Sequence, residues 1–201
     1  MPWASGGSDS HAYSNAWVGV GLGNSYTYPL VQGGSESDSG CGPSLGGPCT
    51  PWAWIEVWPW EAYERQISQL SSIGGDLLFV HVRFTHDAKT NDGRMLWHVV
   101  DMTKSIDLHF GETIHGTLPD GHAEFIAERP TVNGSLPPLA DFGFVDFEAA
   151  QASAPTTGWK GVGNLYHYWY WMQGSTGHLL ASPGAIDSTG YSFSVNWYGH
   201  N

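Results

Sequence analysis

Residues 121–130, with the sequence GHAEFIAERP, hold the most suggestive group of reactive side chains in this chain. If they form a β-strand, His122, Glu124 and Glu128 share one face, and small or apolar residues share the other. Carboxylates beside an imidazole can move protons, which makes Glu124 a candidate catalytic carboxylate. A solvated strand face explains the same pattern, so this stretch alone does not separate the two interpretations.

A second informative stretch is 52–60, WAWIEVWPW. Read as a strand, it has an aliphatic face suited to packing between two sheets. The opposite face carries Glu56 and four tryptophans, namely Trp52, Trp54, Trp58 and Trp60. Indoles around a carboxylate suit the wall of a groove for an extended ligand. The alternative is a second buried aromatic layer, in which each indole N–H needs a partner.

Composition predicts an all-β chain. Glycine (27) and proline (12) are frequent, aromatic residues make up 14%, and charged residues only 13%. This is typical of many short strands joined by turns. We expect strands near 15–21, 26–32, 52–60, 76–84, 95–102, 106–110, 121–130, 140–147, 162–172, 178–182 and 191–198. A short helix is expected within 61–72, and 148–160 is expected to be a connection.

These elements predict an antiparallel β-sandwich of jelly-roll type, without a long helix or an internal repeat. We expect residues 1–14 to be a flexible lead-in and residues 15–201 to form a single domain, since sandwiches of this length are commonly one domain.

The charge balance narrows the possible partners. Seven Lys and Arg stand against nineteen Asp and Glu, a formal net charge of −12. Nucleic acid is therefore not expected as a partner, and no apolar run is long enough to predict a membrane span. In acid the carboxylates become neutral and ten histidines charge, so a cation-poor chain escapes strong self-repulsion. An ordinary acidic protein at neutral pH has the same composition.

The cysteines and histidines suggest no metal site. Cys41 and Cys49 lie in a Gly/Pro/Ser-rich loop, where they would form a disulfide outside the cell and remain thiols in the cytosol. We expect the disulfide. Two cysteines cannot form a Cys-rich zinc site, the HExxH pattern is absent, and the histidines are scattered. No metal and no cofactor are expected.

Other catalytic patterns fit poorly. Residues 42–46, GPSLG, match G-x-S-x-G, but they lie in a loop rather than between a strand and a helix. Glu124 and Glu128 would stand about 13 Å apart along a strand, farther than the paired carboxylates of glycosidases.

Several segments together resemble the glutamic peptidases, or eqolisins, a family of acid endopeptidases. The resemblance spans residues 15–200 and rests on the order and spacing of its parts. AWVGV at 16–20 is similar to the family's opening strand (AWVGI), and VQGG at 31–34 to its catalytic-glutamine segment. AWIEVWP at 53–59 is similar to the aromatic segment (AWYEWYP), and GHAEFIAE at 121–128 to the catalytic-glutamate strand (NAEWIVE). Residues 140–147 and the closing run also fit.

The resemblance implies a sandwich of two bent sheets, concanavalin A-like, with Gln32 and Glu124 as a catalytic dyad on the concave face. It implies a substrate groove formed by Trp17, Trp54, Glu56, Trp58, Glu128 and His122. It also implies polypeptide substrates, no cofactor and insensitivity to pepstatin. We further expect a monomer secreted into an acidic environment.

The chain departs from the family pattern near this dyad. Gly21 stands where the family has an acidic residue, and His122 replaces an asparagine. Phe125 replaces a tryptophan, and Trp52 an acidic residue. Gln32 and Glu124 themselves are retained, so the departures concern the surroundings of the dyad. A charged His122 beside Glu124 would favour the carboxylate form of that side chain.

The chemistry agrees with these residue types. A carboxylate at Glu124 can accept a proton from water and later pass it to the leaving amine. The side-chain amide of Gln32 can donate a hydrogen bond to the oxyanion of a tetrahedral intermediate. The sequence therefore predicts an acid-acting endopeptidase. The alternatives are a glycan- or peptide-binding β-sandwich module and a glycoside hydrolase.

Overall fold

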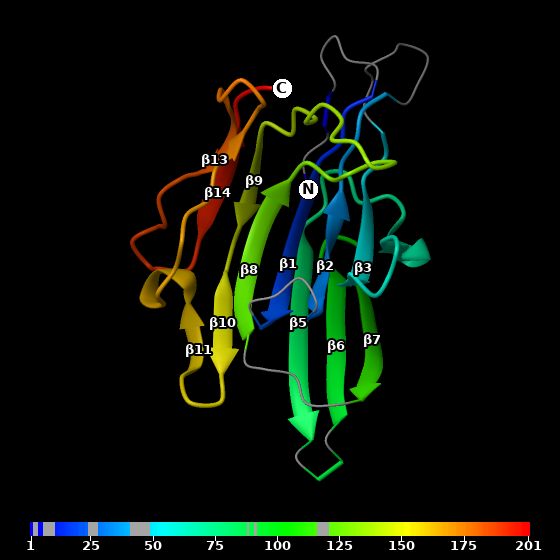
Figure 1. The fold of residues 1–201 in the computed structure, drawn as a ribbon, viewed down its shortest axis with the longest axis vertical. Coiled ribbons are helices and arrows are strands. Elements are labelled where there is room, and N and C mark those ends of the chain that lie inside the picture. The colour runs from blue at the N-terminus through cyan, green and yellow to red at the C-terminus, as the bar shows by residue number, and fades with distance from the viewer. Residues whose placement is uncertain are drawn as a thin grey trace. The chain divides into compact units, whose positions relative to one another are not determined.

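The computed structural model describes residues 1, 4–5, 11–23, 28–40, 49–87, 89–90, 92–115 and 121–201. Nearly all the regular structure is β-strand, arranged in antiparallel sheets, and two short 3₁₀ helices complete it (Figure 1). The all-β class predicted from composition is confirmed. Within the described residues, no helix has the length and apolar character needed to cross a membrane.

The chain divides into two compact units. The first comprises Met1, residues 16–36 and residues 50–126. The second comprises residues 2–15, 37–49 and 127–201.

The first unit contains two sheets, and within each sheet the strands lie next to one another (Figure 1). A five-stranded sheet has the order β4-β3-β2-β1-β8, with bounds Arg65–Gln66, Trp52–Trp58, Leu30–Glu36, Asn15–Leu22 and Gly121–Glu128. A three-stranded sheet has the order β5-β6-β7, with bounds Leu78–Asp87, Asp92–Asp101 and Ile106–His115.

A hydrophobic core joins these two sheets into a sandwich. The five-stranded sheet contributes Val31 of β2 and alternate residues of β3, and the other sheet contributes alternate residues of β6. The buried side chains include Val31, Ala53, Ile55, Val57, Met95, Trp97 and Val99. Burying one large apolar side chain stabilises the fold by about 1.5–3 kcal/mol. The core therefore fixes which face of β2 and β3 points outward.

The second unit has its own sheets. A four-stranded sheet has the order β12-β13-β14-β9, with bounds Met172–Gln173, Leu179–Pro183, Phe193–Trp197 and Phe144–Phe147. A hairpin pairs β10 (Gln151–Ala154) with β11 (Gly158–Gly161). Phe147 and Phe193 stack across β9 and β14 with ring centroids 5.1 Å apart.

Two elements of the second unit differ from the sequence prediction. The expected connection 148–160 contains the β10–β11 hairpin, whose turn ends at Gly158 with a φ of 64°, a conformation that favours glycine. The expected strand 162–172 contains only the 3₁₀ helix η2 (Val162–Asn164) and the first residue of β12. Aromatic residues occupy both alternate sets of 166–171, so no apolar face distinguishes a paired strand there.

Two elements of the first unit also differ. The predicted strand 26–32 lies at 30–36, because the chain stays buried without a break from Val31 through the two glycines to Ser35. The predicted helix within 61–72 is replaced by β4 and the 3₁₀ helix η1 (Ser68–Leu70). There Ile67 and Leu70 are buried in the core, and three-residue spacing fits a 3₁₀ turn as well as an α-helix.

One hydrogen bond ties the two sheets of the first unit at Gln32. The Trp97 indole Nε1–H donates to the main-chain oxygen of Gln32 at 2.8 Å, and both groups are buried. An unpaired buried polar group costs about 1–3 kcal/mol, so this bond constrains where β2 lies on the core.

We expect Trp97→Phe to lower the free energy of unfolding by about 2–3 kcal/mol, because it removes the buried hydrogen bond to the Gln32 carbonyl and part of the buried surface. Urea unfolding followed by fluorescence measures this. Trp60→Phe, at a side chain 50% exposed, is the matched control and should change stability by less than about 0.5 kcal/mol. Equal effects of the two substitutions would contradict a structural role for the Trp97 bond.

Candidate active site

Gln32 and Glu124 lie on strands of the same sheet. Gln32 is on β2, Glu124 is on β8, and β1 lies between these two strands. Neighbouring strands are about 4.8 Å apart, so the two backbones are separated by about 10 Å. Side chains of this length that lean toward each other across β1 can contact one shared water molecule.

The two side chains also share a face of that sheet. A Cβ atom added at Gly34 of β2 would lie 2.5 Å from the Cβ atom of Trp17 on β1. Gly34 and Trp17 therefore lie on the same face of the sheet. Gln32, two residues from Gly34, belongs to it. A Cβ added at Gly21, also on the Trp17 face of β1, would lie 3.2 Å from Glu124 Oε1. Gln32 and Glu124 therefore face the same side.

Two glycines of β1 lie on the strand between these side chains. Gly19 and Gly21, which we call the glycine gap, share the Trp17 face and present no side chain there. A Cβ at Gly21 would lie 2.8 Å from two atoms of the His122 ring, closer than real contacts of this kind. Any residue larger than glycine at position 21 would therefore displace His122.

His122 binds Glu124 directly. Its Nε2 lies 2.6 Å from Glu124 Oε1, and the side chains are 53% and 26% exposed. When protonated, the imidazole donates a charge-assisted hydrogen bond to the carboxylate. Gly21 and His122, two departures from the glutamic peptidase pattern, thus complement each other: the histidine ring occupies the space that glycine leaves beside Glu124.

Glu56 holds the side chain of Gln32 from the other side. The two residues are directly opposite in the β2–β3 pairing, and Gln32 Nε2 donates to Glu56 Oε2 at 2.5 Å. Their exposed fractions are 6% and 7%. Gln32 Oε1 is buried and accepts no hydrogen bond from the described residues. The amide is therefore held at its nitrogen end.

Burial also changes the acidity of Glu56. It raises the pKa of this carboxyl from its ordinary 4.5 to about 7, against the opposing effect of the Gln32 hydrogen bond. The nearby carboxylates of Glu64 and Glu61 raise the pKa further. Glu56 therefore carries a proton in acid and loses it near neutrality.

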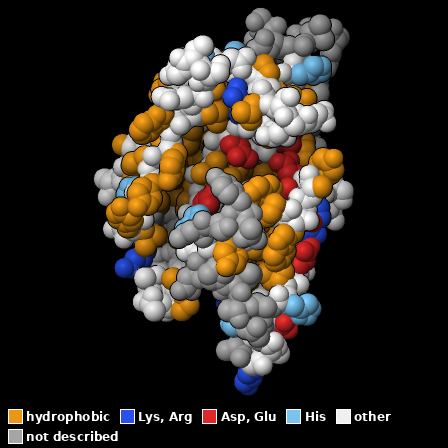
Figure 2. Space-filling model, in the orientation of Figure 1, with side chains coloured by type: hydrophobic (Ala, Val, Ile, Leu, Met, Phe, Trp, Pro, Cys, Tyr) orange, Lys and Arg blue, Asp and Glu red, His pale blue; other side chains and the backbone are white. Residues whose placement is uncertain are grey.

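The other predicted groove residues lie on the same sheet, with different exposure. Trp17 and Trp54 are buried, whereas Trp58 at the end of β3 is 39% exposed. Glu128 lies four residues beyond Glu124 on β8, on the same alternate set. Figure 2 shows acidic side chains (red) among hydrophobic ones (orange) on the viewed face over these strands.

Two features are not evident from the sequence pattern alone. The sequence predicts Glu56 in a groove wall, but not its hydrogen bond to Gln32. That bond depends on which residues of β2 and β3 lie opposite each other. The two strands are joined by fifteen residues, 37–51, and a connection of this length does not determine the register. A cluster of His98, Asp107 and His109 on β6 and β7 was also missed. Its signal was present, because the predicted strands 95–102 and 106–110 are close enough to form a hairpin.

The predicted Cys41–Cys49 disulfide involves Cys41, which lies outside the described residues, and it stays a prediction.

Comparison with known proteins decides the family. The model of the family described as "Peptidase A4 family" matches residues 1–194. The chain belongs to the Peptidase A4 family, the glutamic peptidases. The resemblance seen in the sequence is confirmed, and membership makes the chain a hydrolase of a peptidase family with polypeptide substrates.

A solved structure of this family has the same fold. The crystal structure of aspergilloglutamic peptidase from Aspergillus niger matches with a TM-score of 0.70 and 23% sequence identity, covering 93% of this chain and 99% of that chain. The β-sandwich fold of the A4 peptidase is thereby confirmed. No curated protein sequence matches this chain.

The raised pKa of Glu56 gives a stability prediction. Between about pH 4.5 and 7 the unfolded chain has released this proton while the folded protein keeps it, so the stability contributed by Glu56 is full below pH 4.5 and lost as pH rises to about 7. The loss amounts to about 3 kcal/mol. Glu56→Gln removes this pH-dependent loss of stability, because glutamine does not titrate. Thermal unfolding at about pH 4 and pH 7.5 should show a smaller decline in Tm with pH for this variant than for the wild type.

Glu148→Gln, which neutralises an exposed carboxyl, serves as the matched control and should keep the wild-type decline. If Glu56→Gln also kept it, Glu56 would not be the buried proton carrier described above.

Proposed function

We propose that this A4 peptidase is an acid-acting endopeptidase in which Gln32 and Glu124 act together on a water molecule and a peptide bond. One observation carries the proposal: the amide and the carboxylate share a face of one sheet, on strands separated only by β1, with the glycine gap between them. Family membership supports the peptidase chemistry, and the geometry supplies the two groups that it needs.

The proposed reaction begins with a water molecule over the glycine gap. Glu124 accepts a proton from the water, whose oxygen attacks the peptide carbonyl carbon, and the carbonyl oxygen takes up the negative charge. Gln32 Nε2 donates a hydrogen bond to this oxyanion. The C–N bond then breaks as Glu124 passes its proton to the leaving nitrogen, so that a carboxylic acid and an amine leave and Glu124 is restored.

Glu56 is proposed to orient the amide of Gln32 according to pH. An ionised Glu56 can only accept, so it holds Gln32 Nε2 as the structure has it. A protonated Glu56 can donate its O–H to Gln32 Oε1, which accepts no other hydrogen bond among the described residues. The amide then turns its NH₂ toward the glycine gap, where the oxyanion forms. Protonation of Glu56 thus favours the reactive orientation.

The proposal also covers the location of the enzyme, its response to inhibitors and its oligomeric state. A dyad and an orienting carboxyl that work in acid suit secretion into an acidic medium, where a Cys41–Cys49 disulfide also persists. Hydrolysis through Gln32 and Glu124 needs neither a metal nor an aspartic dyad, so neither a chelator nor pepstatin should inhibit it. We propose a monomer, since all the proposed dyad residues come from one chain.

Cleavage of a denatured protein tests the dyad. We expect the wild type to cut it between about pH 2 and 5 with pepstatin and a chelator present, because Glu124 and Gln32 carry the chemistry. Gln32→Ala should lower kcat by about 10²–10³, as loss of one oxyanion donor does. Glu124→Gln should lower it at least as much, since the proton acceptor is lost. Peptide mass spectrometry measures the products.

Several outcomes would contradict the proposal. Wild-type activity in both variants would exclude the dyad, and inhibition by the chelator would indicate metal-dependent hydrolysis. A folded protein that binds but never cuts across this pH range would be a binding module, and release of reducing sugar from a glycan would indicate a glycoside hydrolase. Gln66→Ala, an exposed glutamine on β4, is the matched control and should keep wild-type kcat.

The role of Glu56 makes a separate prediction. Gln at position 56 can donate to Gln32 Oε1 at any pH, so Glu56→Gln should retain activity in acid and keep a higher kcat/KM than the wild type above about pH 7, where wild-type Glu56 has lost its proton. A pH profile of kcat/KM measures the shift, with Glu148→Gln as the control. An unchanged alkaline limb would show that Glu56 does not govern the orientation of Gln32.

A further inference from the structure

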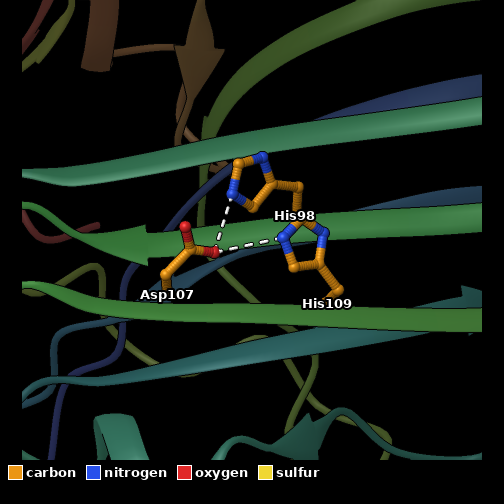
Figure 3. Close-up of side chains that lie close together, drawn as sticks. All are labelled: His98, Asp107 and His109. Atoms are coloured by element: carbon orange, nitrogen blue, oxygen red, sulfur yellow. Dashed lines mark hydrogen bonds and ion pairs between the residues drawn. The ribbon is translucent and has the colours of Figure 1, made fainter.

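The outer face of the three-stranded sheet carries a cluster that the peptidase chemistry does not use. His98 lies on β6, and Asp107 and His109 lie on β7 (Figure 3). His98 and His109 are directly opposite in the β6–β7 register, and Asp107 is two residues from His109, so all three share one face. The same register buries Trp97 and Val99 on the other side, which fixes the cluster on the exposed side.

The three side chains converge on one point. Asp107 Oδ1 lies 2.9 Å from His98 Nε2 and 3.2 Å from His109 Nε2, and the three ligand atoms all lie within 4.8 Å of one another. The imidazole rings are stacked, with centroids 4.1 Å apart and an interplanar angle of 13°. Figure 3 shows both ring nitrogens turned toward the same carboxylate oxygen.

These distances suit a first-row divalent metal ion. Zinc binds imidazole nitrogen and carboxylate oxygen at about 2.0–2.2 Å, so neighbouring ligand atoms of a tetrahedral site lie about 3.3 Å apart. The observed separations from Asp107 need to widen by only a few tenths of an ångström. Two imidazoles and one carboxylate favour Zn²⁺, Ni²⁺ or Cu²⁺ over Mg²⁺ or Ca²⁺, which prefer oxygen ligands.

The site is open to solvent but supported by packing. The side chains of His98, Asp107 and His109 are 31%, 59% and 70% exposed, so an ion can enter and water can complete its coordination. Phe79 on β5 packs edge-on against the His98 ring at 5.3 Å, which restricts the orientation of that ligand. A partly immobilised ligand loses less entropy when the metal binds.

We propose that His98, Asp107 and His109 form a binding site for a zinc-class divalent cation on the outer face of β6 and β7. The ion joins the two strands of this hairpin and plays no part in peptide hydrolysis. The other ionisable groups on this face are His81, Arg83 and Asp87 of β5, Asp92 and Arg94 of β6, and His115 of β7.

A bound ion would link β6 and β7 across the hairpin. A ligand that binds only the folded state raises stability by mass action, so zinc is expected to stabilise the first unit. This site is independent of the Gln32–Glu124 proposal and is tested separately from it.

Zinc titration of the full chain, freed of metal by a chelator and dialysed, tests the site. Isothermal titration calorimetry at about pH 7.5 should show one saturable site per chain. With zinc at about a hundredfold excess over its Kd, Tm at pH 7.5 should rise by about 5 °C. Cobalt in place of zinc should give a visible absorption spectrum typical of nitrogen and oxygen ligands.

Single substitutions identify the ligands. His98→Ala, Asp107→Ala and His109→Ala should each weaken zinc binding at least about tenfold, the loss expected when a direct ligand is removed. His115→Ala is the matched control. His115 pairs with Asp92 at 2.7 Å at the far end of the same hairpin, but no second ligating histidine joins that pair among the described residues. This control should bind zinc like the wild type.

The proposal is overturned if the wild type shows no saturable zinc binding at pH 7.5, or if His98→Ala and His109→Ala bind as tightly as the control. It is also overturned if the substitutions lower Tm equally with and without zinc, since that is the behaviour of a hydrogen-bonded triad without an ion. Circular dichroism of each variant confirms folding before titration. Proteolytic activity in acid should be the same in all of them.

Discussion

The placement of Gln32 is the constraint on which the rest of the proposed site depends. Its main-chain oxygen accepts from the buried Trp97 indole, and its side-chain nitrogen donates to the buried Glu56 carboxyl. One bond fixes β2 on the core and the other fixes the amide within the sheet. Both bonds are buried, and a hydrogen bond of this kind contributes about 0.5–1.5 kcal/mol to stability. The core and the proposed oxyanion donor are therefore parts of one arrangement.

Glu124, by contrast, is partly open to solvent. Its side chain is 26% exposed, and it is paired with the more exposed His122, whose ring lies over Gly21. The surroundings of the two carboxyls therefore differ: Glu56 is buried and its pKa is raised, whereas Glu124 is accessible and paired with a histidine. This division is the usual physical route by which two carboxyls on one face take different roles.

Much of the candidate site was predictable from the alternation of residues along single strands. Period-two alternation in 121–128 and 52–58 put Glu124, His122 and Glu56 on the correct faces, and the order and spacing of four segments were enough to indicate the family. What pattern did not reveal depends on register. The Gln32–Glu56 bond and the His98–His109 pair both require knowing which residues of two strands lie opposite. The strand expected at 162–172 failed for a related reason, since aromatic residues on both faces give no signal of pairing.

The most direct measurement is a crystal structure of Glu124→Gln with an uncleaved peptide bound at acid pH. The proposed mechanism requires the scissile carbonyl carbon to lie over Gly19 and Gly21, with its oxygen within about 3.1 Å of Gln32 Nε2 and the side chain at 124 on the opposite side of the peptide bond. A peptide bound elsewhere on the sheet, or a Gln32 amide that presents its oxygen to the carbonyl, would contradict it.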